Sequence, residues 1–501
     1  YQDVGLHPYD PPIEATFVRE IGDSFEEFVV SLPDETLTDN RWTRLYEEVL
    51  GVRIQYDWTA KGDLYRQKLG VSLASGDIPD IVEVNALQLR LLSNMGLIQN
   101  LTEVYEEYAT DFTKMILTQE GKGPFEAATI DGKLMGIPET DASIERAMVI
   151  WIRSDWLDSL GLAAPQTIED VTAISQAFTE RDPDGNGLDD TYGLAIAEHL
   201  WDPVAGVAGF MAGFGAYPEI WLEDHHGKLI YGGVQPEVKE ALQALQNMYK
   251  EGWMDPEFGY KNGDQVRSDL AAGKLGMMYG EQWGSFHVQG SVENFDAKWQ
   301  AFPIVSDIGE RPMVPLKFST STYFAVKQGY AYPEAVVKLF NLHLEKNWGE
   351  TAEYGTFYND NGAVWSLSPV TPFPARKNLE AYRQLEKFRE SADVTVLDGE
   401  AQAIQRYIES YEHYGDINGW GWERTYGPEG ALSIIDQYEK RGQLLYDAFT
   451  GAPTETMIEK QAFLRDKQHE TYMNIILGSP ISEFDRFVEE WSMLGGDQIT
   501  A

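Results

Sequence analysis

Segments typical of β-strands alternate with segments typical of α-helices along most of this chain, and that alternation restricts the folds available to it. Residues 52–58 alternate apolar and polar side chains, which is typical of a strand with one buried face. A helical stretch over about 63–74 and a second predicted strand over 80–84 follow directly. A strand, a helix and a strand so close together predict a unit with parallel strands. Further strands are predicted at 147–152, 194–197, 275–279 and 323–327, a hairpin at 129–134, and helices at 86–94, 236–251 and 333–344.

The length of the chain indicates more than one hydrophobic core. The chain has 501 residues, of which 43% are hydrophobic, and it is longer than single cores usually support. From about residue 378 onward the pattern changes to helix after helix, without a convincing strand. The sequence therefore predicts an α/β fold of two lobes with a helical C-terminal portion.

The charge balance argues against some partners. Lys and Arg number 39 against 81 Asp and Glu, which gives a formal net charge of −42. Such a field repels nucleic acid and anionic membrane surfaces, so we expect neither as a partner. The chain has no cysteine, which excludes disulfides, thiolate metal ligands and cysteine nucleophiles. It also has no apolar run long enough to span a membrane.

Catalytic motifs are missing from the sequence. It contains no GxSxG, no HExxH, no Walker loop and no complete GxGxxG. Paired carboxylates could serve a glycosidase, but among 81 acidic residues such pairs arise by chance. The sequence does not exclude an enzyme and offers no support for one.

An acidic loop, RDPDGNGLDDT at 181–191, carries the clearest chemical signal. Oxygen ligands at alternate positions can surround a calcium ion, and the two glycines permit the tight turns that this requires. The loop departs from an EF-hand because its twelfth position is Gly193 instead of a glutamate. We expect a structural calcium ion, and a solvated turn without an ion is the alternative. The expected ligands are the side chains of Asp182, Asp184, Asn186 and Asp190 and the carbonyl of Leu188.

Five segments carry a family resemblance: SGDIPDIVEVNALQLRLLSNMGLIQNLTEVYEEYA, YGGVQPEVKEALQALQNMYKEGWMDPEF, AAGKLGMMYGEQWG, GAPTETM and FDRFVEEWSMLGGDQIT. Together they resemble the extracellular solute-binding proteins of family 1, the capture components of carbohydrate ABC importers. The likeness is greatest to the long lipoproteins of Gram-positive bacteria such as Paenibacillus and Bacillus. The loop at 181–191 is similar to that of the alginate-oligosaccharide binding proteins, where the calcium is structural and lies away from the sugar. Thr191 stands where that loop has an acidic ligand, which leaves room for water as the sixth ligand.

The resemblance implies a periplasmic-binding-protein-like fold, in which hinge strands join two discontinuous α/β lobes. It implies crossings between the lobes near 139–147, 305–322 and 354–373. We expect lobe 1 to comprise residues 1–142 with 312–360, and lobe 2, which carries the calcium loop, to comprise 143–311 with 361–501. The ligand then binds between the lobes, which close about the hinge.

The resemblance also implies where such a protein works. We expect a monomer on the extracellular side, at the outer face of the cytoplasmic membrane, that delivers an oligosaccharide to the permease subunits of an ABC transporter. Members of the family are anchored through a lipidated cysteine, which this sequence lacks.

Candidate ligand contacts lie where the predicted strands end and where the chain crosses between lobes, because ligands bind beyond the carboxyl ends of parallel strands. Aromatic rings can cover the apolar faces of sugars, while carboxylates and amides bond their hydroxyls, although each tryptophan could instead pack in a core. The candidates at strand ends are Trp58, Asn85, Trp201, Glu281, Gln282 and Trp283. The candidates elsewhere are Glu139 and Asp141 at the first crossing, and Trp420 and Trp422 in a glycine-rich loop that we expect to lie outside the core.

These patterns support an oligosaccharide-binding protein, with a carbohydrate-active hydrolase or lyase as the alternative. The patterns leave the sugar, its linkage and its length open. The negative charge disfavours uronic-acid polymers, although Arg146, Arg153 and Lys317 could form a local basic patch.

Overall fold

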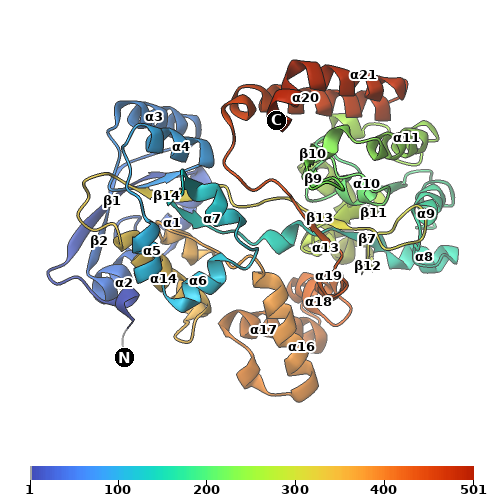
Figure 1. The fold of residues 1–501 in the computed structure, drawn as a ribbon. Helices are drawn as coiled ribbons and strands as arrows, with labels where there is room; N and C mark the ends of the chain where they lie inside the picture. Colours follow the sequence, from blue (N-terminus) through green and yellow to red (C-terminus); the bar gives the residue numbers. More distant parts are fainter. Residues whose placement is uncertain (1–2) are drawn as a thin grey trace.

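The computed structural model describes residues 3–501 and contains two separate hydrophobic cores. One core takes its buried side chains from residues 13–137 and 323–370, and the other from 144–316 and 379–499. We call the parts of the chain around these cores lobe 1 and lobe 2; Figure 1 shows them side by side, lobe 1 on the left and lobe 2 on the right. The predicted two-lobed α/β fold with discontinuous lobes and a helical C-terminal portion is confirmed.

Lobe 1 contains two small sheets with helices around them. β1 (Ile13–Glu20) and β2 (Val52–Ala60) pair in parallel. β14 (Thr322–Val326) lies between β3 (Ile81–Val84) and β6 (Ile137–Glu139) and is antiparallel to both. The helices of this lobe are α1 (Asp23–Ser31), α2 (Arg41–Leu50), α3 (Gly62–Ser75), α4 (Ala86–Asn94), α5 (Thr102–Tyr108), α6 (Asp111–Leu117), α7 (Gly123–Ala128), α14 (Ala335–Trp348) and α15 (Tyr354–Phe357). The predicted hairpin is formed by β4 (Thr129–Ile130) and β5 (Lys133–Leu134).

The predicted pairing of the first two strands is wrong, although both strands and the helix between them exist. β3 pairs with β14 and not in parallel with β2, because β1 pairs with β2 and is itself the strand that contacts the start of β3. Side chains link β1 to the start of β3: the Thr16 N–H donates to Asp80 Oδ2 at 3.1 Å, and the Asp80 N–H donates to Thr16 Oγ1 at 2.9 Å. These contacts hold the two sheets of lobe 1 together without a continuous ladder.

Lobe 2 is built on a four-stranded sheet in the order β12 (Trp299–Phe302), β7 (Val149–Arg153), β11 (Leu275–Gly280) and β8 (Tyr192–Leu194). Every residue of β7 and β11 is buried, as their uninterrupted apolar runs predict. Two short pairs complete the strands: β9 (Trp221–Glu223) with β10 (Leu229–Tyr231), and β13 (Val314–Leu316) with β15 (Leu444–Tyr446). The helices before residue 300 are α8 (Ser154–Leu160), α9 (Ile168–Glu180), α10 (Ala208–Ala212), α11 (Glu237–Lys250), α12 (Gly263–Ala271) and α13 (Gly284–Phe295). Those of the C-terminal portion are α16 (Lys377–Ser391), α17 (Gly399–Tyr414), α18 (Trp420–Tyr426), α19 (Ala431–Lys440), α20 (Glu455–Ile476), α21 (Ser482–Trp491) and α22 (Asp497–Thr500).

Two stretches belong to a different lobe from the one that the expected boundaries assign to them. Val314 and Leu316 belong to the core of lobe 2, because β13 pairs with β15, a strand in the portion predicted to be entirely helical. The stretch 364–370 belongs to the core of lobe 1. It is held there by the Arg19 guanidinium, which donates to the Ser368 carbonyl at 3.2 Å, and by a 2.7 Å hydrogen bond between the Tyr46 and Ser368 hydroxyls.

The segments that cross between the lobes run side by side. The Phe373 N–H donates to the Thr140 carbonyl at 2.9 Å, and the Thr140 hydroxyl donates to the Phe373 carbonyl at 2.7 Å. A third crossing joins β13 to β14, whose first residue, Thr322, pairs with Glu139. The lobes are therefore connected by a narrow hydrogen-bonded hinge.

Candidate ligand-binding site between the lobes

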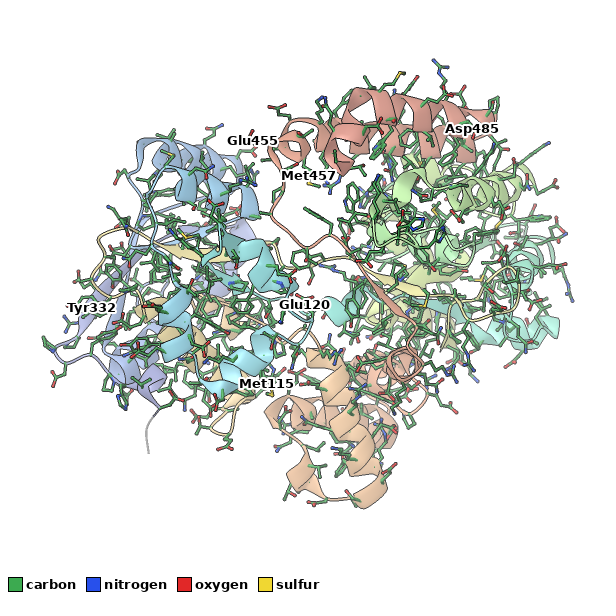
Figure 2. The ribbon with its side chains drawn as sticks, in the orientation of Figure 1. Met115, Glu120, Tyr332, Glu455, Met457 and Asp485 are labelled. Atoms are coloured by element: carbon green, nitrogen blue, oxygen red, sulfur yellow. The ribbon has the colours of Figure 1, made fainter. Side chains whose placement is uncertain are left out.

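A cavity of about 1170 Å³ is lined by residues of both lobes and of the crossings between them. Its volume exceeds the roughly 300–1,000 Å³ of most small-molecule sites, so it suits an extended ligand. Ala86, the first residue of α4, and Tyr323 of β14 line it from lobe 1. Met457, near the start of α20, lines it from lobe 2, and Figure 2 shows this residue beside the gap between the lobes.

Aromatic side chains of lobe 2 form part of the cavity wall. Trp201, in the loop after β8, is partly buried and meets Tyr472 of α20 edge to face, with ring centroids 6.1 Å apart. Trp221 and Tyr231 pack together at 5.3 Å, and Tyr231 stacks on Trp491 at 5.2 Å. These contacts fix the rings in place before any ligand binds, which lowers the entropic cost of binding.

Glu281 brings a buried carboxyl group to the cavity directly after β11. The residue is 2% exposed, and neither carboxyl oxygen has a well-formed hydrogen bond, although the Trp283 indole approaches it. Burial raises the pKa of Glu281 to about 8, against the opposing effect of the Arg146 guanidinium 3.7 Å away. At neutral pH this carboxyl is mostly protonated, so it can both donate and accept a hydrogen bond from a ligand hydroxyl.

Basic side chains gather around Glu219 on another side of the cavity. Lys317 Nζ lies 3.7 Å from the Glu219 carboxylate. Burial raises the pKa of Glu219, and the charges of Lys317, His199 and Arg465 oppose that rise. All four residues line the cavity, so basic side chains face its interior beside Glu219, and Asp447, which Lys317 also faces, lines it as well.

Of the predicted ligand contacts, Trp201 and Glu281 line this cavity. Asn85 lies next to it, as the capping residue of α4 immediately before Ala86. Gln282 is buried with its side-chain oxygen unpaired, and Trp283 caps α13 with its ring against His287 at 4.7 Å. These last three side chains do not line the cavity in this conformation.

Glu139 and Asp141 occupy the hinge. Glu139 is half-buried and accepts a hydrogen bond from the Thr371 hydroxyl at 3.1 Å and another from the Thr371 N–H. Burial, reinforced by the charge of Glu83, raises the pKa of Glu139 to about 8. Thr371 and Glu83 also line a second cavity of about 370 Å³ in lobe 1. Asp141 is exposed, and its carboxylate accepts the Ala142 N–H at 2.8 Å.

The placement of Trp420 and Trp422 in a loop is wrong. Both lie on helix α18, Trp420 is 4% exposed, and Trp422 stacks on Tyr407 with ring centroids 4.9 Å apart. The surrounding glycines permit close packing instead of a loop: a Cβ at Gly421 would lie 2.6 Å from the Phe286 ring. Neither tryptophan lines either of the two cavities described above.

Trp58 and Arg153 lie outside both cavities and contact other side chains. The Trp58 ring lies against Tyr65 at 5.6 Å and beneath the Lys68 ammonium at 4.7 Å, away from both cavities. Arg153 is buried and pairs with Asp155 through two nitrogens, at 2.9 and 2.6 Å. Arg146 and Lys317, the other members of the expected basic patch, do line the main cavity.

The cavity also contains residues that the sequence analysis missed. His199 and Glu219 come from loops, and Arg465 is one of several charged residues on a long helix. No local pattern distinguishes Glu219 and Arg465 from surface residues. His199 carried a usable signal, because it lies two residues before Trp201 in the loop after β8.

The acidic loop at 181–191 forms tight turns with side chains folded inward. Gly185 and Gly187 have φ of 67° and 78°, and Asp182 has φ of 48°. Asp182 Oδ2 accepts the Gly187 N–H at 2.9 Å, while its Oδ1 is buried without a partner. Asn186 donates to Asp190 Oδ2 at 2.8 Å. Leu188 is 62% exposed, so the loop lies at the surface of lobe 2.

The fit of this loop to calcium is partial. Burial and the charges of Asp190 and Asp182 raise the pKa of Asp184, against the Asn186 N–H that donates to it, as expected of carboxylates held close together. Within residues 3–501, however, no three Asp, Glu, His or Cys side chains are arranged as a metal site. The orphaned Asp182 oxygen and the crowded carboxylates are features that a bound cation would satisfy.

Comparisons with known proteins agree with this architecture. Residues 25–347 match the model of the family described as bacterial extracellular solute-binding protein. Lipoprotein LipO of Bacillus subtilis is 23% identical over 467 residues, covering 90% of this chain and 86% of LipO. The polygalacturonan/rhamnogalacturonan-binding protein YtcQ of the same organism is 22% identical, covering 90% and 85%. The Streptococcus pneumoniae FusA EF-hand mutant in complex with fructo-nystose has a TM-score of 0.61 at 17% identity, covering 97% of each chain.

The chain belongs to the family of bacterial extracellular solute-binding proteins. This family consists of binding proteins and not of enzymes, so the alternative of a hydrolase or lyase is set aside. No helix within residues 3–501 is long and apolar enough to cross a membrane.

Proposed function

We propose that this protein is the substrate-binding component of an ABC importer, which captures an oligosaccharide between its lobes and delivers it to the permease subunits. The observation that carries the proposal is the cavity of about 1170 Å³ lined from both lobes. A ligand held there touches both lobes at once, and differential contact of this kind drives hinge closure.

The chemistry of the cavity wall suits sugars. Trp201 offers an aromatic face for the apolar side of a sugar ring, and the Glu281 carboxyl can bond a hydroxyl as donor or acceptor. The combination of fixed rings with a few unpaired polar groups is that of a specific binding site. Asn85, Gln282 and Trp283 lie close enough in the chain to join such a site when the lobes close.

The acidic loop is proposed to hold a structural calcium ion. The side chains of Asp182, Asp184, Asn186 and Asp190 and the Leu188 carbonyl would be its ligands, and water would complete the shell. The ion would neutralise carboxylates that otherwise repel one another, and it would stabilise lobe 2 without taking part in sugar binding.

The protein is proposed to act as a monomer on the cell surface, held at the outer face of the cytoplasmic membrane by a lipid anchor whose cysteine this sequence does not contain. The name of its relative LipO and the extracellular character of the family support this location.

A titration with neutral and acidic oligosaccharides tests the proposal. We expect saturable heat of binding and a higher melting temperature with the cognate sugar, which is then recovered intact by chromatography. Shorter products would indicate an enzyme, and the absence of saturable binding across the panel would refute an oligosaccharide-binding function.

A further inference from the structure

The cations of the cavity define the class of sugar. We infer that the ligand is an acidic oligosaccharide whose carboxylates bind Lys317 and Arg465, with His199 beside them. This inference rests on the proposed function and adds the chemistry of the ligand. It also reverses the expectation from net charge, because the local potential of a cavity is set by the groups that line it.

The basic side chains have donors left for a ligand. Lys317 is 3.7 Å from Glu219 and Arg146 is 3.7 Å from Glu281, distances beyond those of hydrogen-bonded ion pairs. The side chains of Lys317 and Arg146 are 49% and 46% exposed. Arg465 is exposed and forms no hydrogen bond or ion pair with any residue in 3–501.

Some cations of the chain are held closely by acids: Lys261 lies 2.8 Å from Asp269, and Lys239 lies 2.7 Å from Asp485. Others have no acid so near, such as Lys274 at 3.7 Å from Asp269. Lys317, Arg146 and Arg465 are of this second kind and all face one cavity, so they are placed to meet negative charge from the ligand. A carboxylate offers two acceptor oxygens to lysine and arginine, and such charge-assisted bonds are stronger than neutral ones.

Carboxylates also line the cavity, and several of them are already engaged. Asp447 accepts the N–H groups of Trp221 and Phe449, at 3.0 and 3.2 Å. Asp202 accepts the Val204 N–H at 3.0 Å and lies 3.6 Å from Arg267. Glu219 lies among Lys317, His199 and Arg465, and Asp447 also faces Lys317. Glu198 and Asp466 line the cavity as well, where they face His469.

The test compares uronic-acid oligosaccharides with their methyl esters, which keep the sugar chain and lose the charge. Galacturonate, mannuronate, guluronate and glucuronate oligomers are titrated by calorimetry at low and at physiological salt. We expect at least one acid to bind about tenfold or more tighter than its ester, with the difference shrinking as salt increases.

Lys317→Met and Arg465→Met are the test variants, and Lys274→Met is the matched control. Lys274 lies 3.7 Å from Asp269, as Lys317 does from Glu219, but it is 61% exposed and outside the cavity. We expect each test variant to weaken binding of the acid about tenfold and to leave its ester unaffected, while the control changes neither.

Two other results would overturn the inference and are distinguishable. If neutral oligosaccharides bind and no acid binds tighter than its ester, the inference is wrong while the proposed function stands. If neither neutral nor acidic oligosaccharides bind, the proposed function fails and the inference fails with it.

Discussion

Replacement of Trp201 by alanine should separate ligand binding from folding. The ring lines the cavity and is partly buried against Tyr472. A buried aromatic side chain covers about 150–250 Å², so one ring face offers about 100 Å² to a sugar. At about 25 cal/mol per Å² this contact contributes about 2.5 kcal/mol, and its loss should weaken binding about sixtyfold. Stability should fall by only about 1 kcal/mol, from the lost edge-to-face contact with Tyr472.

Trp422→Ala provides the matched control. Trp422 packs between Tyr407 and Phe286 in the helical portion, with centroids at 4.9 and 5.2 Å, and touches neither cavity. Its removal should lower the free energy of unfolding by about 3 kcal/mol or more and leave affinity unchanged. Calorimetric titration and urea unfolding of both variants measure the two effects. If Trp201→Ala keeps its affinity and loses stability as Trp422→Ala does, Trp201 is a packing residue and the binding site has been placed wrongly.

Two further predictions concern the acidic loop and the buried carboxyl. Chelation should lower the melting temperature and leave sugar affinity unchanged, because calcium bound only to the native state adds stability with increasing ion concentration. Asp182→Ala should melt at the same temperature with and without chelator. A wild-type melting curve that does not change with chelator would count against the ion. The folded-state pKa of about 8 for Glu281 lies above its ordinary value of 4.5, so the stability from its protonated form is fully present below pH 4.5 and is lost as pH rises through 8. In melting experiments, Glu281→Gln should therefore become more stable relative to the wild type as pH rises from 4.5 to 8. If the stability of the two proteins depends on pH in the same way, the carboxyl is not buried in solution.

Local patterns determined most of the elements of the fold. The apolar runs of β7 and β11 predicted buried strands, and Thr167 forms with Asp170 the capping box that starts α9. The pairing of the strands was harder to predict, because paired strands come from distant parts of the chain. β15 is three residues long and becomes a strand only through β13, which lies far earlier in the sequence.

The candidate site was predictable where it depends on strand ends. Trp201 and Glu281 follow strands of lobe 2 and line the cavity. The reasoning failed for Trp420, because a glycine-rich sequence serves both loops and closely packed helices. Arg465 could not be predicted as a site residue, because its position depends on how α20 lies across lobe 2, and no local pattern encodes that arrangement.

Capture of the ligand between moving lobes is the central claim, and small-angle scattering measures it directly. With the cognate oligosaccharide at saturation, the radius of gyration should decrease, because the lobes close about the hinge formed by the paired crossings at Thr140 and Phe373. Closure should reverse when the sugar is removed by dialysis. An unchanged scattering curve at saturating ligand would contradict the account, since a ligand that bridges both lobes must favour the closed state.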